Sequence, residues 1–118
     1  MIPYYRAKSN ERKNTYVEGL LIGIDEELNL CTIRTKDDYI GGEVCYLNTL
    51  SINFPDMIDR KGNKIFASLS EDGKGGDIMQ DDEYIGIAKY IDCQFVVEYE
   101  NCIDNIDNGN FDAIGIQE

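Results

Sequence analysis

Alternation of apolar and polar residues, the pattern of half-buried strands, recurs along this chain. Two strands are predicted over Thr15–Ile24 (TYVEGLLIGI) and Leu28–Thr35 (LNLCTIRT), joined by a short acidic turn at Asp25–Glu27. A third strand is predicted over Glu43–Ile52 (EVCYLNTLSI). It should end before Pro55, because proline lacks a backbone donor and restricts the residue that precedes it.

A turn is predicted at Asp59–Asn63, because an Asp side chain can accept hydrogen bonds from the backbone ahead of it and Gly62 can take a positive φ. We expect Asp59 and Gly62 to have structural roles. Lys64–Leu69 should then form a short extended segment.

The second half of the chain contains the clearest hairpin. Glu83–Tyr90 (EYIGIAKY) and Gln94–Glu100 (QFVVEYE) flank a tight connection around Ile91–Cys93. Residues 101–108 could form one helical turn, and Phe111–Ile116 could supply a last strand.

No stretch of a dozen residues keeps the apolar spacing of an amphipathic helix, whereas short strands and turn signals alternate throughout. The sequence therefore predicts a mainly β fold, a small barrel or a sandwich. A length of 118 residues is typical of one domain, here residues 1–118.

The net charge of −12 is unevenly spread: residues 1–60 carry seven basic and ten acidic side chains, and residues 61–118 carry four and thirteen. Direct binding of nucleic acid is not expected, because it depends on Lys and Arg displacing counterions from phosphates. An anionic membrane surface would also repel the chain. An acidic surface can keep a protein soluble, or it can imitate DNA and occupy a basic site on another protein.

The chain has four cysteines, Cys31, Cys45, Cys93 and Cys102, and no histidine. No pair has the spacing of a structural zinc site, and no metal or cofactor is expected. The first ten residues lack the apolar core of a signal peptide, and no run is long enough to span a membrane. We therefore expect a cytoplasmic protein in a bacterial cell, with each thiol free and buried as a small apolar group.

No catalytic arrangement is apparent. Without histidine the usual general base is missing, and a pair of carboxylates among 23 acidic residues could act only in the manner of a glycoside hydrolase. The aromatic residues Tyr84, Tyr90, Phe95 and Tyr99 are predicted to pack in the core and across strands, since basic residues that would accompany nucleic-acid stacking are lacking around them.

The glycine-rich loop Glu71–Asp77 is the predicted binding site, because exposed loops on a rigid scaffold are where binding residues collect. Its candidate residues are Glu71, Asp72, Lys74 and Asp77. The glycine spacing matches neither a phosphate-binding loop nor a dinucleotide fingerprint, so a flexible turn is the simpler interpretation.

Several segments, taken in order, resemble the YopX family of small phage and prophage proteins. Asn14–Leu21 is similar to the family's early strand, and Asn48–Phe66 is similar to its central signature, a strand followed by D-x-x-G-x-x-I-[FY]. Gly76–Ile78 matches the G-D-[IV] that follows, and Phe111–Gly115 resembles the closing strand. In many members the Gly-Asp follows the aromatic residue almost at once, whereas here Ala67–Gly75 intervenes.

The resemblance implies a C-terminal SH3-like β-barrel with a smaller N-terminal β-rich portion packed on it, and a possible subdivision into residues 1–55 and 56–118. It brings no activity or catalytic residues, so the predicted function is a non-enzymatic protein-interaction module of phage origin. The alternative is an acidic DNA mimic that inhibits a host nuclease or another DNA-binding protein, and a carboxylate hydrolase is a third hypothesis. A protein partner is expected, and open strand edges make a homo-oligomer possible.

Overall fold

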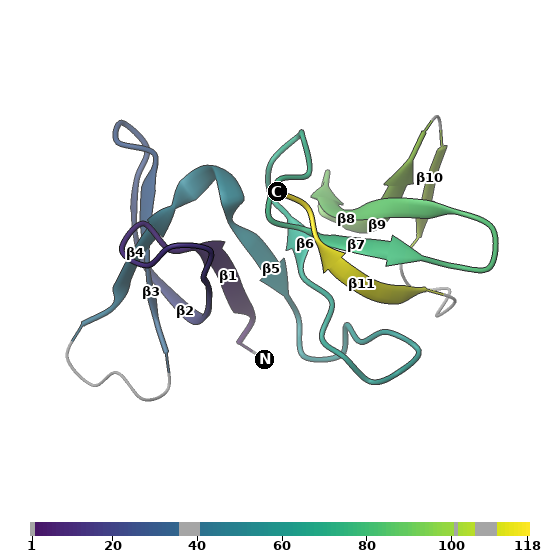
Figure 1. The fold of residues 1–118 in the computed structure, drawn as a ribbon, viewed down its shortest axis with the longest axis horizontal. Helices are drawn as coiled ribbons and strands as arrows, with labels where there is room; N and C mark the ends of the chain where they lie inside the picture. The colour runs from purple at the N-terminus through teal and green to yellow at the C-terminus, as the bar shows by residue number, and fades with distance from the viewer. Residues whose placement is uncertain (1, 36–40, 101, 106–110) are drawn as a thin grey trace.

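Strands dominate the computed structural model, which describes residues 2–35, 41–100, 102–105 and 111–118 (Figure 1). This part of the chain contains eleven strands, one 3-10 helix and no α-helix. The elements are β1 (Tyr4–Lys8), β2 (Tyr16–Asp25), β3 (Leu30–Arg34), β4 (Glu43–Tyr46), η1 (Leu47–Thr49), β5 (Ser51–Asn53), β6 (Ala67–Ser68), β7 (Asp77–Gln80), β8 (Ile85–Ile91), β9 (Gln94–Tyr99), β10 (Cys102–Asn105) and β11 (Asp112–Ile116). Among the described residues, no helix is long and apolar enough to cross a membrane.

The strands form one mixed sheet whose hydrogen-bonded order is β10-β9-β8-β6-β5-β1-β2-β3-β4, and β7 joins β8 to β11 as a branch. All pairings are antiparallel except that of β6 with β8, which meets at Ser68 and Lys89. The prediction of a mainly β fold is confirmed. The described strands do not close into the expected SH3-like barrel, because the C-terminal strands β10 and β11 each pair with a single strand and not with each other.

Most of the predicted strands are present. β2 and β3 form the predicted first pair, and β8 and β9 form the predicted hairpin around a two-residue turn in which Asp92 and Cys93 have φ values of 49° and 64°. Such φ values suit a turn whose twist matches that of the flanking strands. β11 confirms the predicted last strand.

The single strand predicted over residues 43–52 is wrong, since it consists of β4, the 3-10 turn η1 and β5. The turn is stabilised by the Leu50 amide, which donates to the Leu47 carbonyl, and by the Thr49 hydroxyl, which donates to the Tyr46 carbonyl. The apolar pattern continues through the turn, so periodicity alone does not reveal it.

Three strands, β1, β7 and β10, were not predicted. Residues 102–105 form β10 and not a helical turn, and the rest of that predicted turn lies outside the described residues. In the segment predicted to be extended over residues 64–69, Ala67 and Ser68 pair as β6, and Lys64 forms an isolated bridge with Ile58.

Two apolar clusters fill the interior. One comes from residues 7–50 and is centred on Ile33, Cys31 and Cys45, and the other comes from residues 57–113 and is centred on Ile65, Met79 and Val97, with Phe111 packed among them. Figure 1 shows the strands of the first cluster on the left and those of the second on the right, with β5 between them. The subdivision at residue 55 stays a prediction.

Candidate functional site

The predicted binding loop lies between β6 and β7 and is held by its own polar groups. The Asp72 carboxylate accepts hydrogen bonds from the Ser70 hydroxyl (2.8 Å) and from the Lys74 amide (3.0 Å), and the Ser68 hydroxyl donates to the Lys74 carbonyl. The Lys74 amide and the Ser70 hydroxyl hold the pKa of Asp72 below its usual value. Glu71 and Asp72 are exposed and Lys74 is half-buried, so the loop presents charged side chains on a defined turn.

Gly75 fixes where this loop sits. Its φ is +82°, and a Cβ at this position would overlap the carbonyl oxygen of Thr49. The loop therefore packs directly on η1, and a side chain at residue 75 would force the two segments apart. This contact places Lys74, from the second half of the sequence, next to the 3-10 turn η1 in the first half.

Asp77, the fourth candidate residue, points inward. One oxygen of its carboxylate accepts from the Arg6 guanidinium at 2.7 Å, and the other accepts from the Phe66 amide at 2.9 Å. The two side chains of the ion pair are 8% and 5% exposed, and the guanidinium also donates to the Gly75 carbonyl and lies 4.5 Å from the centre of the Phe66 ring. Burial raises the pKa of the Asp77 carboxyl, and the attraction of Arg6 opposes that shift. We assign Asp77 a structural role, joining β7 to β1.

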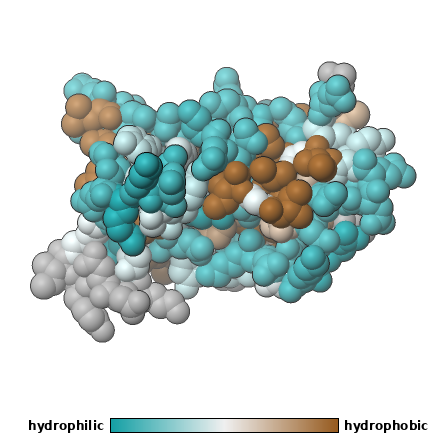
Figure 2. Space-filling model, in the orientation of Figure 1, coloured by the Kyte–Doolittle hydropathy of each residue, from teal (hydrophilic) through white to brown (hydrophobic). Residues whose placement is uncertain are grey.

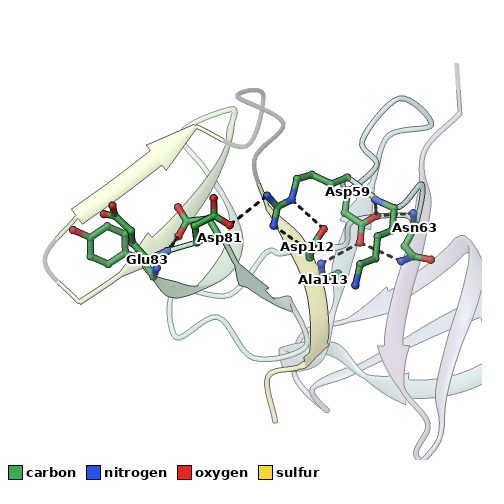
Figure 3. Close-up of polar contacts among 10 residues, drawn as sticks. Asp59, Asn63, Asp81, Glu83, Asp112 and Ala113 are labelled. Carbon is green, nitrogen blue, oxygen red and sulfur yellow. Dashed lines mark hydrogen bonds and ion pairs between the residues drawn. The ribbon is translucent and has the colours of Figure 1, made fainter.

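Asp59 organises the predicted turn and also ties it to β11. Its carboxylate accepts from the Lys61 and Asn63 amides, from the Asn63 side chain and from the Ala113 amide (Figure 3). Burial raises the pKa of Asp59, but these hydrogen bonds outweigh it, so the pKa lies below its usual value. Gly62 has a φ of +84°, as the turn requires.

An apolar face lies on the outer side of the C-terminal strands, away from the core. Cross-strand pairs place Gly115 beside Ile78, Ile78 beside Ile87, and Ile87 beside Glu98, whose other neighbour is Ile103. We call the isoleucine face the set Ile78, Ile85, Ile87, Ile103 and Ile114, of which Ile85, Ile103 and Ile114 are 59%, 59% and 52% exposed. In Figure 2 hydrophobic atoms gather over the region where β7 and β11 lie in Figure 1.

The predicted loop borders this face. A Cβ at Gly73 would lie 2.9 Å from the Ile87 side chain, and the Lys89 ammonium beneath the loop donates to the Glu71 carbonyl and to Glu98. Glu71 and Asp72 therefore lie at one end of the isoleucine face. The turn 81–84, which joins β7 to β8, brings two more exposed carboxylates to the other end, Asp82 and Glu83.

Sequence reasoning did not select these isoleucines. Their signal was present, since Ile85 and Ile87 alternate within a strand that follows the acidic turn 81–83. Alternation alone, however, does not tell which face of a strand is covered, and here the alternating positions on the other face, Gly86 and Ala88, are the buried ones.

Arg60 links the acidic turn to β11. Its guanidinium donates to both oxygens of Asp112, at 3.3 and 2.9 Å, and lies 3.7 Å from an oxygen of Asp82 (Figure 3). The Asp81 carboxylate accepts from the Glu83 and Tyr84 amides and so shapes the turn. These contacts hold the edge of the isoleucine face in one arrangement.

The chain was compared with protein-family models, with curated proteins and with solved structures. None of them matches it.

The aromatic residues and two of the cysteines occupy the positions that packing predicts. Tyr90, Phe95 and Tyr99 pack against the C-terminal core cluster, and Tyr84 stacks on Tyr99 with ring centres 4.8 Å apart.

Cys31 and Cys45 are buried and face each other across β3 and β4, and burial raises their pKa values to about 11 and about 12. Cys93 and Cys102 are exposed, so the expectation that every thiol is buried is wrong for these two. Among the described residues, no three His, Cys, Asp or Glu side chains are grouped closely enough to hold a metal ion.

Proposed function

We propose that this chain is a non-enzymatic protein-interaction module of phage or prophage origin, related to the YopX family and acting in the bacterial cytoplasm. The isoleucine face is the observation that carries the proposal. Exposed apolar side chains gathered on one face and rimmed by polar residues are a usual mark of a protein contact site. Under this proposal the C-terminal strands are an open version of the SH3-like barrel that the resemblance implies.

The roles of the signature residues support the family relationship. Asp59 and Gly62 build the turn of the D-x-x-G-x-x-I-[FY] pattern, and Ile65 and Phe66 are each 2% exposed in the interior. The Gly-Asp that follows supplies the carboxylate of the buried ion pair with Arg6. Asp59, Gly62, Ile65, Phe66 and Asp77 of the pattern thus all have structural roles in this chain.

The partner that fits this surface presents apolar side chains surrounded by Lys or Arg. Exposed carboxylates lie at both ends of the isoleucine face, and the second half of the chain carries thirteen acidic against four basic residues. Two copies of the chain meeting through this face would place like charges opposite each other, which disfavours association. A different, basic protein is therefore the proposed occupant, and the homo-oligomer stays a prediction.

The DNA mimic is the second candidate, and the overall charge of −12 is what favours it. Several acidic side chains of residues 59–98 are nevertheless buried or paired with a cation inside the protein. Asp59 and Asp77 are buried, and Glu98 pairs with Lys89 at 2.8 Å. This leaves fewer carboxylates for a row spaced like phosphates and supports the module over the mimic.

The test is an affinity pull-down from bacterial lysate at low and at high salt, with three forms of the tagged protein. These are the natural chain, the variant Ile85→Ser/Ile114→Ser, and the control Leu28→Ser, which changes an exposed apolar residue (66% exposed) on the distant β2–β3 turn. The module predicts a partner that survives high salt and is lost only in the double variant. A DNA-binding protein that is lost at high salt and captured equally by all three forms would favour the mimic.

A further inference from the structure

A pocket of about 360 Å³ lies where the N-terminal strands meet the loop before β7. Its walls include Lys8 of β1, Tyr16 of β2, Tyr46 of β4, Asn48 of the 3-10 turn η1, and Lys74 of the loop. Pockets of roughly 300–1,000 Å³ hold small molecules in proteins. The isoleucine face and this pocket share no residue, so the pocket concerns a second function.

Two lysines line this pocket, although the chain as a whole has a net charge of −12. Lys8 and Lys74 are half-buried, and neither forms an ion pair with any other described residue. The buried cations Arg6 and Lys89, in contrast, are each paired with a carboxylate. A partly desolvated ammonium gains from an anion that satisfies it, because burying an unpaired charge is unfavourable.

Packed backbone brings the two lysine residues to the same pocket. The Lys8 amide donates to the Thr49 hydroxyl at 2.8 Å, which ties β1 to the 3-10 turn. On the other wall, Gly75 lies against the Thr49 carbonyl and so fixes the neighbouring Lys74. The pocket is thus formed by the protein itself, and little ordering is needed when a ligand enters, which favours binding.

The remaining walls suit an organic group. Tyr46, a residue that is 38% exposed, offers an aromatic ring, and Asn48 offers an amide. Tyr16 also lines the pocket, and its buried hydroxyl has no hydrogen-bond partner among the described residues. Glu118 also lines the pocket but is exposed, where water weakens its charge.

We propose that this pocket binds a small organic phosphate, with the Lys8 and Lys74 ammonium groups donating to the phosphate oxygens and the Tyr46 ring contacting the organic part. A phosphate monoester carries close to two negative charges at neutral pH, which matches two unpaired ammonium groups better than a single carboxylate would. The chain can thus bind a metabolite independently of its protein partner.

The test is a titration of the ¹⁵N-labelled protein, followed by amide chemical shifts, with inorganic phosphate, adenosine monophosphate and succinate as probes. The variants are Lys8→Gln and Lys74→Gln, with Lys61→Gln as the control, because Lys61 is exposed and lies on the Asp59 turn away from the pocket. Neither pocket lysine has an ion pair to lose within the described structure, so both variants should fold.

We expect saturable changes in the amide chemical shifts of residues around Asn48 and Gly75. Adenosine monophosphate should bind more tightly than inorganic phosphate, and succinate should bind more weakly than adenosine monophosphate. Each pocket variant should lose about tenfold in affinity, as expected for a charge-assisted hydrogen bond, while the control is unchanged. Lys74→Arg should retain binding. No saturable shift up to about 10 mM of any probe, or binding that both pocket variants retain, would overturn the proposal. Equal affinities for the two phosphates would overturn the contact with Tyr46.

Discussion

Removal of the Asp77 carboxylate should destabilise the fold strongly. In Asp77→Ala, the Arg6 guanidinium, 8% exposed, loses its ionic partner, and the Phe66 amide loses its acceptor. Breaking a buried ion pair from one side costs about 3–5 kcal/mol, because the remaining charge stays out of water. That is a large part of the roughly 5–15 kcal/mol that holds a typical domain folded. For a chain of this size the midpoint of thermal unfolding should fall by about 12–20 °C.

The assay is urea unfolding followed by circular dichroism and by tyrosine fluorescence, since the chain has eight Tyr and no Trp. Glu71→Ala is the matched control, because it removes an exposed carboxylate from the same loop. It should change the free energy of unfolding by less than about 0.5 kcal/mol. The double variant Arg6→Met/Asp77→Leu should be less destabilised than Asp77→Ala, because no unpaired charge remains.

A loss below about 1 kcal/mol in Asp77→Ala would refute this reasoning, since it would mean that the Arg6 guanidinium reaches water or another partner when Asp77 is absent. A double variant that is less stable than Asp77→Ala would do so as well, because it would show that lost packing, and not the unpaired charge, dominates.

Three further predictions concern separate parts of the molecule. Gly62→Val should lower the free energy of unfolding by about 1–2 kcal/mol, because a β-branched side chain is strained at a φ of +84°, and unchanged urea unfolding would contradict the turn. Because the folded pKa of Asp59 lies below its unfolded value, the carboxylate stabilises the fold above about pH 4 and this stabilisation is lost as the pH falls through the folded pKa. The stability difference between the natural chain and Asp59→Asn, measured by urea unfolding, should therefore be full at pH 7 and shrink below about pH 4; a constant difference would argue against an ionised Asp59. Under native conditions a thiol reagent should modify the exposed Cys93 and Cys102 quickly and the buried Cys31 and Cys45 slowly. Burial raises the pKa values of Cys31 and Cys45 to about 11 and about 12, so little of either thiol is in the reactive thiolate form. Equal modification rates for all four thiols would contradict the fold around β3 and β4.

Local features of the chain were predictable from the sequence, and long-range ones were not. The β2–β3 pair and the β8–β9 hairpin follow from alternation and short turns, which involve residues close in the sequence. The strand β1 was missed because Arg6 and Lys8 give it a polar pattern. Only the structure shows that Arg6 is buried, since its partner Asp77 lies 71 positions away.

The same limit applies to the candidate sites. The loop 71–77 was selected from its glycines and charges, and it does border both the isoleucine face and the pocket. The pocket also needs Lys8, which lies in another part of the chain, and no local pattern connects it with Lys74. The isoleucine face depends on the register between β7, β8 and β11, which brings together side chains that are unremarkable individually.

The position of β1 also has a consequence for how the chain is made. β1 leaves the ribosome before the other described strands, yet the carboxylate that neutralises Arg6 follows 71 residues later. At about 5–20 residues per second, synthesis leaves this arginine hydrated and unpaired for several seconds. β2–β5 can pair with β1 during that time, but the two halves can join through this ion pair only when translation has reached β7. A pause in translation before Asp77 would therefore prolong the lifetime of a half-folded nascent chain.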